Sequence, residues 1–437
     1  MKQTKDMRNL LRNGIWGSTA DAFTAPFIIP FALALGATEL VIGIINSLQN
    51  LGMLASQVPG AEIVWFFRKR KMINVACEIL AKTSWLAIVL IPFLPSDSWL
   101  TVMIVSITLS SFFVNLSYPA WTSFIADVVP KEFRGRYFGN RNMWMGFAAI
   151  IASVAAGFYL DLFPKGNLLG FSSIFLFGVI AGIIAVGYYS RLRGKPVRLA
   201  EHSFRDYLKV TGNMRRFLAF TAFFNFSYMI ASPFFAVYML NNLGMDYGSY
   251  VLFAAIAAFA GLVSQRHWGR LMDKFGCRPM IGISVVGAAF VPFLYIFINQ
   301  QNLLMLIPVQ ILSGVAWAGV GLVTFNMFLD VSDRKKLVTQ TANYNIIATL
   351  PMVIAPIIGG LVAQNLSFII PGIPLVFLLS SILRFSSLAL LKDLKESHVK
   401  RMYSTEHAFR VFVSIHPVKG LVHEIRTVEK RMLGKRL

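Results

Sequence analysis

Asp21 is the residue of this chain whose position in the sequence most favours chemistry. It is the only acidic side chain well inside an apolar segment without a base at helical spacing on the same segment. A carboxylate in a low-dielectric setting favours its protonated form, so Asp21 can bind and release a proton. Two alternatives stay open: a fixed salt bridge to a distant base, with Arg141 or Arg384 as candidates, and a position near a wet helix end.

Polar side chains recur at helical spacing in four apolar segments, which predicts one polar stripe on each helix. The stripes are Asn13, Gly17, Asp21 and Thr24; Asn46, Asn50, Met53 and Gln57; Ser111, Asn115, Tyr118 and Thr122; and Thr221, Asn225, Tyr228 and Ser232. Such stripes either line a wet cavity or form hydrogen bonds to neighbouring helices. We expect a cavity for the first, third and fourth stripes and helix packing for the second.

The composition places these stripes in a membrane. The chain is 56% hydrophobic and 14% charged over 437 residues, with 38 Phe, which leaves too little polar surface for a soluble protein of this length. Twelve segments are long enough to cross the bilayer. They are residues 14–35, 39–65, 73–94, 99–125, 138–160, 170–190, 216–240, 248–270, 279–298, 302–328, 338–363 and 370–391.

The 41 Lys and Arg residues predict the topology. Almost all of them fall in the N-terminus, alternate loops and the C-terminal tail, whereas the other connections carry only Lys165. By the positive-inside rule, both termini are cytoplasmic in a multi-pass protein of the cell membrane. The net charge of +21 then serves contact with anionic lipids, and nucleic acid is not the expected partner.

The segments form two halves. We expect a six-helix bundle over residues 1–190, a cytoplasmic linker over 191–215, a second bundle over 216–391 and a basic cytoplasmic tail over 392–437. Three sets of matches relate the bundles: Leu54–Gln57 to Leu262–Gln265 at offset 208, Ala25–Phe27 to Ser232–Phe234 at 207, and Asp127 to Asp330 at 203. Gly36 also falls on Gly244. The order of these matches predicts a duplicated six-helix unit, in which Tyr228 is the counterpart of Asp21.

The clearest linear motif runs from Gly269 to Arg278 and fits G-x-L-x-D-[RK]-x-G-x-[RK]. It resembles the signature loop of the major facilitator superfamily (MFS). Gly269 and Gly276 permit a tight turn, Asp273 can accept hydrogen bonds from a helix N-terminus, and bases such as Arg278 can latch onto acids across the inner face. The first-half copy is degraded, because Gly60 is kept while Glu62, Val64 and Phe67 replace the leucine, the aspartate and the second glycine.

The segment after residue 125 resembles another loop of the same superfamily, through Pro130, Arg134, Gly135, Arg136 and Gly139. An ordinary basic loop is the alternative. The resemblance covers nearly all of residues 1–391 and implies an all-α integral membrane protein with twelve transmembrane helices in two pseudo-symmetric bundles, rocking about a midplane site. The inner gate would comprise Asp127, Arg134, Arg136, Gly269, Asp273, Gly276, Arg278 and Asp330.

The leading hypothesis is a monomeric secondary active transporter for a small organic solute, working by alternating access and coupled to protons through Asp21. The expected cavity residues are Asp21, Asn115, Tyr118, Thr122, Asn225, Tyr228 and Trp317. Glu78 and Lys82, four residues apart, are expected to form a structural pair, while the partner of Arg384 is not defined. No cofactor or metal-ligand spacing is found, which disfavours a membrane enzyme. A receptor or scaffold that uses the basic tail is the other alternative.

Overall fold

The computed structural model describes residues 5–129, 134–193, 212–333, 337–366, 371–392 and 394–396, and within them every regular element is a helix. The first half contains α1 (Lys5–Ala22), α2 (Ile28–Ala34), α3 (Glu39–Phe67), α4 (Arg70–Val89), α5 (Trp99–Val128), α6 (Arg134–Leu160) and α7 (Leu168–Ser190). The second half contains α8 (Gly212–Met229), α9 (Phe234–Val237), α10 (Tyr247–Phe275), α11 (Cys277–Tyr295), α12 (Leu306–Val331), α13 (Leu337–Asn365) and α14 (Gly372–Ser387).

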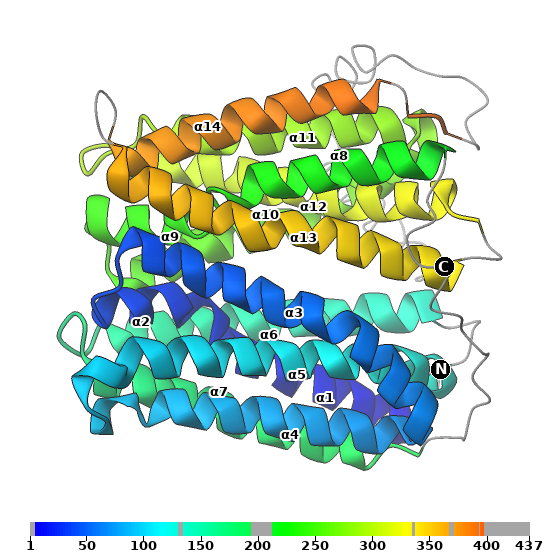
Figure 1. Ribbon diagram of the computed structural model, residues 1–437, viewed down its shortest axis with the longest axis horizontal. Coiled ribbons are helices and arrows are strands. Elements are labelled where there is room, and N and C mark those ends of the chain that lie inside the picture. Colours follow the sequence, from blue (N-terminus) through cyan, green and yellow to red (C-terminus); the bar gives the residue numbers. More distant parts are fainter. Residues whose placement is uncertain are drawn as a thin grey trace, which may run out of the picture.

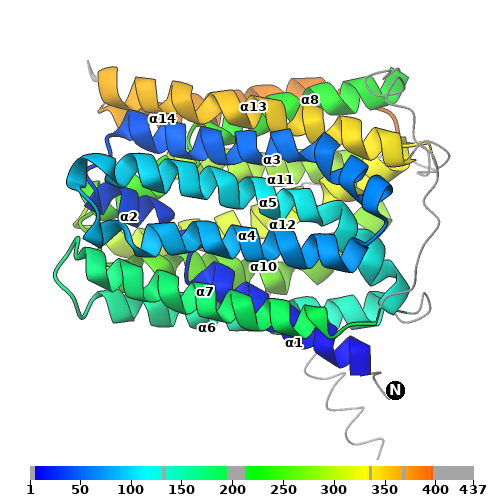
Figure 2. The ribbon, with the colours of Figure 1, turned by 60° about the horizontal axis from the view of Figure 1, so that its bottom comes forward.

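The long helices run roughly parallel and antiparallel to one axis (Figures 1 and 2), and Figure 1 shows them in two groups, one from each half of the chain. We call the end that carries Lys5, Arg68 and Arg191 the basic end, and the end that carries Asp97 and Lys165 the far end. Most of the linker expected over 191–215 and nearly all of the tail expected over 392–437 lie outside the described residues.

Ten of the described helices are long and apolar enough to cross a membrane. The two expected segments that fall outside this set are 14–35 and 39–65. The first is interrupted, because a short 3-10 turn at Ala25–Phe27 separates α1 from α2. The second is the continuous helix α3, whose hydropathy is lowered by the amides of Asn46, Asn50 and Gln57.

The backbone repeats with the offsets that the sequence matches predict. Pro26 lies in the break between α1 and α2, and Pro233 directly precedes α9 after the end of α8. Gly36 and Gly244, at offset 208, both have positive φ, at 82° and 70°. Only glycine adopts this conformation without steric cost. The duplication therefore extends to helix breaks and turns, not only to residue identities.

The turns at the basic end correct the alignment of the signature loop. Gly276 has φ 90° between α10 and α11, and its first-half counterpart is Arg68, with φ 53° between α3 and α4. The offset is again 208, so neither Phe67 nor Gly60 occupies the place expected for it. Gly60 instead allows close packing, because a Cβ there would lie 2.9 Å from the Leu116 carbonyl oxygen of α5.

The two halves pack through α3 against α13 and through α6 against α10. Glycines allow the closest approach, since a Cβ on Gly43 would lie 2.3 Å from the carbonyl oxygen of Pro356. A large buried cluster at the far end joins both halves, through Phe31 and Phe175 of the first and Phe234 of the second. Other buried clusters, toward the basic end, belong to one half each. Apolar closure between the halves is therefore concentrated at the far end.

Candidate functional site

The first half contains a partly open cavity of about 170 Å³ between α1, α4, α5, α6 and α7. Four of its lining residues are charged: Asp21 on α1, Glu78 and Lys82 on α4, and Arg141 on α6. Asp21 is exposed to this space and Arg141 is buried. The stripe on α1 reaches the cavity as expected, since Asn13, Gly17 and Asp21 all line it. The sequence did not predict that two acids and two bases would meet there.

Glycines create the room for both bases. A Cβ on Gly14 of α1 would lie 2.7 Å from Nη2 of Arg141, and a Cβ on Gly182 of α7 would lie 2.5 Å from Cε of Lys82. The long side chains therefore cross the surfaces of neighbouring helices at positions that lack a side chain. Any larger residue at Gly14 or Gly182 would displace one of the two cations.

Lys82 acts electrostatically on both Asp21 and Glu78, and the two carboxylates also act on each other. Among the described residues, no N–O distance within 4.0 Å joins Asp21, Glu78, Lys82 or Arg141 to an opposite charge. The fixed salt bridge from Asp21 to Arg141 or Arg384 is therefore absent from this structure. Glu78 and Lys82 also do not form the tight structural pair that their spacing suggested, because both face the cavity.

Arg141 forms one wall of this cavity together with Trp121 of α5. Its guanidinium carbon lies 5.7 Å from the centroid of the Trp121 ring, and its Nε donates to the Leu10 carbonyl oxygen at 3.4 Å. Tyr118 stacks on Trp121 with ring centroids 5.9 Å apart. A cation over an aromatic face is a favourable arrangement, so this wall holds a positive charge in place without a carboxylate.

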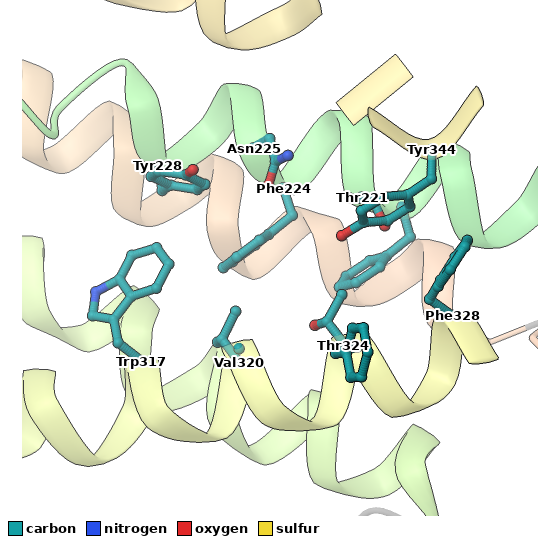
Figure 3. A pocket seen from close by; sticks show the side chains of 12 residues that line it. Thr221, Phe224, Asn225, Tyr228, Trp317, Val320, Thr324, Phe328 and Tyr344 are labelled. Atoms are coloured by element: carbon teal, nitrogen blue, oxygen red, sulfur yellow. The ribbon is translucent and has the colours of Figure 1, made fainter. Parts of the chain in front are cut away.

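The second half contains a larger, partly open cavity of about 290 Å³ between α8, α12 and α13 (Figure 3). Aromatic rings make most of its wall. Tyr228 meets Trp317 edge to face at 4.8 Å between centroids, Phe224 lies 5.7 Å from Tyr228, and Tyr344 lies 4.9 Å from Phe328. No charged side chain is among the described residues that line it. Asn225, Tyr228 and Trp317, all expected in a cavity, meet here.

Three polar groups reach into this aromatic space. Figure 3 shows the hydroxyls of Thr324 and Tyr344 directed into the cavity between the helices. Asn225 donates its Nδ2 to the Ala348 carbonyl oxygen of α13 at 2.9 Å, which fixes the amide and leaves its oxygen available as an acceptor. The cavity thus combines ring surfaces with a few hydrogen-bonding groups, as small-molecule sites do.

Arg384 lies behind this cavity and is only 1% exposed. Its Nη1 donates to the Ala288 carbonyl oxygen of α11 at 2.7 Å, and its guanidinium carbon lies 5.9 Å from the centroid of the Trp317 ring. Arg384 therefore belongs with the aromatic cavity of the second half and not with Asp21.

The two cavities are counterparts in the repeat. At offset 207, the residues of α1 that line the first cavity fall on the residues of α8 that line the second. The pairs are Asn13 with Phe220, Gly14 with Thr221, Gly17 with Phe224, Ser18 with Asn225, and Asp21 with Tyr228. At offset 203, Val114 falls on Trp317, Trp121 on Thr324, and Arg141 on Tyr344. The offsets needed to find this were present in the sequence.

Asn115, Tyr118 and Thr122 of α5 do not line either of these cavities. Asn115 donates to the Ser111 carbonyl oxygen at 2.8 Å and Thr122 to that of Tyr118 at 3.0 Å, so both bond to their own helix. The side chain of Tyr118 is 58% exposed. Val114 and Trp121 are the α5 residues that line the first cavity, so the expected polar face of α5 lies outside these two cavities.

Asn50 and Gln57, from the polar stripe on α3, pack against the other half, as we expected for this stripe. Asn50 donates to the Met352 carbonyl oxygen of α13 at 3.3 Å, and Gln57 accepts from Nδ2 of Asn345 at 3.3 Å. These hydrogen bonds, one to a backbone carbonyl oxygen and one between two amide side chains, join two helices that lie in contact. They form part of the interface between the halves.

The expected inner-gate residues are described only in part. Arg278 contacts the segment after α14, because its Nη2 donates to the Lys392 carbonyl oxygen at 2.7 Å and its backbone N–H donates to Glu396. These contacts of Arg278 lie within the second half. Asp273 is exposed, and both it and Asp330 lie near the thiol of Cys277. Gly269 is partly exposed and has no neighbour that a Cβ would meet.

The side chains of Asp127, Arg134 and Arg136 lie outside the described residues. Nothing in the described part of the chain therefore tests these three members of the proposed gate. Their backbone positions are the end of α5 for Asp127 and the start of α6 for the two arginines.

A polar contact at the far end was not predicted. Asp161, directly after α6, accepts hydrogen bonds from the backbone N–H groups of Tyr247 and Gly248, both at 2.9 Å. These N–H groups begin α10 of the other half, where a carboxylate is favoured by the helix dipole. Lys165 adds an ion pair with Asp246 at 3.2 Å. Short loops and a lone base were the only signals in the sequence.

Comparison with known proteins agrees with this architecture. The sequence profile of the Major Facilitator Superfamily matches residues 14–265 and 217–421. No curated protein matches the chain.

Solved structures share the fold at low sequence identity. The nucleoside transporter NupG has a TM-score of 0.69 at 13% identity and covers 89% of this chain and 100% of its own. An auto-inhibited POT family peptide transporter has a TM-score of 0.75 at 11% identity, and the match covers 92% of this chain and 99% of that transporter. The xylose transporter XylE from E. coli, in an inward open conformation, has a TM-score of 0.70 at 12% identity, and the match covers 92% of this chain and 98% of that transporter. With its profile match across nearly the whole length and its paired six-helix bundles, this chain belongs to the Major Facilitator Superfamily.

Proposed function

We propose that this protein is a secondary active transporter that moves a small organic solute across the cell membrane by alternating access, coupled to protons through Asp21. The observation that carries the coupling is the exposure of Asp21 to a cavity that it shares with Glu78, Lys82 and Arg141. Two acids and two bases balance when all four are ionised. Protonation of Asp21 therefore leaves one positive charge in excess.

This change of charge can drive a change of conformation. Lys82 lies near both acids, so loss of the charge on Asp21 favours a shift of the lysine toward Glu78. Lys82 crosses α7 at Gly182, and Arg141 crosses α1 at Gly14. Their movement would be transmitted to α1 and α7. Coupling of this kind requires two arrangements of packed helices that differ in their affinity for the proton.

The contacts between the halves support alternating access. The far end is held by Asp161 at the start of α10 and by a shared apolar cluster, with the exposed Lys165–Asp246 pair beside them. With the basic end in the cytoplasm, as the distribution of Lys and Arg favours, this arrangement is closed to the outside. The inner gate would then involve Asp127, Asp273, Asp330 and the bases near them.

The proposal is tested by reconstituting the full-length protein into liposomes and measuring uptake of a panel of solutes with and without a pH gradient. We expect the gradient to drive accumulation, and Asp21→Asn to abolish accumulation while retaining exchange down a solute gradient. Asp97→Asn is the matched control, because Asp97 lies in a far-end loop away from both cavities.

Unchanged accumulation in Asp21→Asn would exclude Asp21 as the essential proton site. If no solute moves in either condition with protein that is folded and correctly inserted, transport itself is the wrong function.

A further inference from the structure

Arg384 is a buried cation without a matching anion. It is 1% exposed, its Nε has no hydrogen-bond partner, and its Nη2 lies 3.5 Å from the Tyr228 carbonyl oxygen. No described carboxylate pairs with it. A buried charge is strongly penalised unless it is paired and fully hydrogen-bonded. The carbonyl oxygens of Ala288 and Tyr228 offset only part of this cost.

The position of Arg384 connects it to the aromatic cavity. The ring of Trp317 lines the cavity and also lies against the guanidinium, with 5.9 Å between its centroid and Cζ. Tyr228, which meets Trp317 edge to face, interacts electrostatically with Arg384 as well. The cavity therefore has a positive charge directly behind its aromatic wall and no charged residue of its own among the described lining residues.

The cavity has the size and surface of a site for a ring. Its 290 Å³ correspond to about ten water molecules in the liquid, which is enough for a solute of one or two rings. Phe224, Tyr228 and Trp317 offer both faces and edges to such a ring. The hydroxyls of Thr324 and Tyr344 can bond to its polar substituents (Figure 3).

We propose that this cavity binds the ring of an aromatic solute that carries an anionic group, with Arg384 as the buried counter-charge. The inference rests on the proposed transport function, since this solute would be the cargo. The first cavity does not oppose an anion, because its two acids and two bases balance. Protonation of Asp21 would add a positive charge there and would draw the same anion, so that proton and anion travel together.

The test is equilibrium binding to the detergent-solubilised full-length protein, measured by isothermal titration calorimetry. The probes are indole-3-acetate, indole-3-acetamide and tryptamine, the phenyl analogues of these three, and octanoate as an acid without a ring. We expect the aromatic acid of at least one ring size to bind at least tenfold more tightly than its own amide, its own amine and octanoate.

Variants assign the preference to residues. Arg384→Gln should reduce the ratio of acid to amide affinity to about one while keeping the affinity for the amide, whereas Arg384→Lys should retain a preference for the acid. Thermal unfolding confirms that each variant is folded. If Arg384→Gln does not fold, Trp317→Leu serves instead. This variant should lower the affinity for aromatic acids at least tenfold without changing the affinity for octanoate.

Several outcomes would overturn the inference: equal affinities for acid, amide and amine in both ring series, tighter binding of the amines, or an Arg384→Gln protein that keeps the acid preference. The result separates this inference from the transport proposal. Aromatic acids that bind but never move in liposomes would refute transport and leave the ligand class standing. Transport restricted to aliphatic or cationic solutes would leave the transport proposal standing and refute the ligand class.

Discussion

The two cavities occupy equivalent places in the duplicated fold, yet their chemistry is opposite. Asp21 and Arg141 in the first half correspond to Tyr228 and Tyr344 in the second. The first cavity is lined by two acids and two bases, whereas aromatic rings form most of the wall of the second. Among the described residues, the charge that lies near the second cavity is Arg384, behind the ring of Trp317. The duplicated halves therefore keep a cavity at the same place with different linings, and we propose that one half handles charge while the other binds a ring.

The backbone explains how this division was possible. Both halves break their first helix at an equivalent proline, and both turn at Gly36 and Gly244 with positive φ. These features set where α1 and α8 lie, and they do not depend on which side chains face the cavity. Lining residues could thus diverge, as Gly17 and Phe224 did, without disturbing the fold.

Removal of Lys82 should produce the largest effect on the charge-handling half. Lys82→Met leaves Asp21 and Glu78 near each other without the base that lies close to both, so one acid should stay protonated through the cycle. We expect proton-driven accumulation in liposomes to fall at least a hundredfold. The control is Phe290→Met, the equivalent position in the second half, which should leave accumulation unchanged.

The double variant Glu78→Gln/Lys82→Met sharpens this test, because it removes the unpaired acid together with the base and should recover part of the loss. Equal loss in the single and double variants would mean that Lys82 acts by packing against Gly182 and not by its charge.

Asp161 should have the next largest effect, because it joins the halves. In Asp161→Asn, one carboxylate that accepts two N–H bonds becomes an amide with one accepting oxygen. The loss of about 1–2 kcal/mol should shift the equilibrium toward the outward-open state about tenfold. Spin labels at residues 97 and 299, on the two halves at the far end, should show a larger population of long distances.

Lys165→Gln is the control for Asp161→Asn. It removes an ion pair whose side chains are 60% and 64% exposed, and such pairs contribute little. A larger shift for Lys165→Gln than for Asp161→Asn would assign the far-end closure to the exposed pair.

Replacement of Glu396 should give the smallest effect. It tests a difference between the two halves at the basic end. Arg70 of the first half binds the Ser123 carbonyl oxygen of α5, whereas its counterpart Arg278 holds the segment after α14 through Lys392 and Glu396. Burial raises the pKa of the Glu396 carboxyl above its ordinary value, and Asp330 adds to the rise, while hydrogen bonds from the Arg278 and Cys277 backbone lower it.

A raised pKa means that the docked segment binds a proton more tightly than the free one. The docked segment is therefore most favourable below the ordinary pKa of 4.5, and it loses stability as the pH rises through the raised pKa. Glu396→Gln should remove this dependence and raise the melting temperature at pH 7.5 by about 1 °C. A melting temperature that Glu396→Gln lowers at pH 7.5 but leaves unchanged below pH 4.5 would show instead that the charged form holds the segment.

Much of the fold could be predicted from the sequence. Hydrophobic length located most of the spans, and the repeat offsets paired Pro26 with Pro233 and Gly36 with Gly244, where the structure has equivalent helix breaks and turns. The exceptions have local causes. Pro26 and the turn around it interrupt the first span, and amide side chains in α3 serve contacts between the halves.

The sequence predicted residues of the candidate site only where their spacing along a single helix was enough to identify them. Asp21, Asn225 and Tyr228 were found by their spacing, and each of them lines a cavity. Asn115 and Thr122 share that spacing but bond to their own helix. Glu78 and Lys82 were expected to pair within one helix, because spacing on α4 does not report what α1 places opposite them.

The sequence by itself determined that this is a duplicated, twelve-span membrane protein with one intramembrane acid of unusual position, because hydropathy and spacing act along a single helix. Only the tertiary structure decided that Asp21 shares its cavity with a second acid and two bases, that Arg384 lies behind Trp317, and that Asp161 accepts hydrogen bonds from the start of α10 at the far end. Those arrangements depend on the rotation and neighbours of each helix, which packing between distant segments sets.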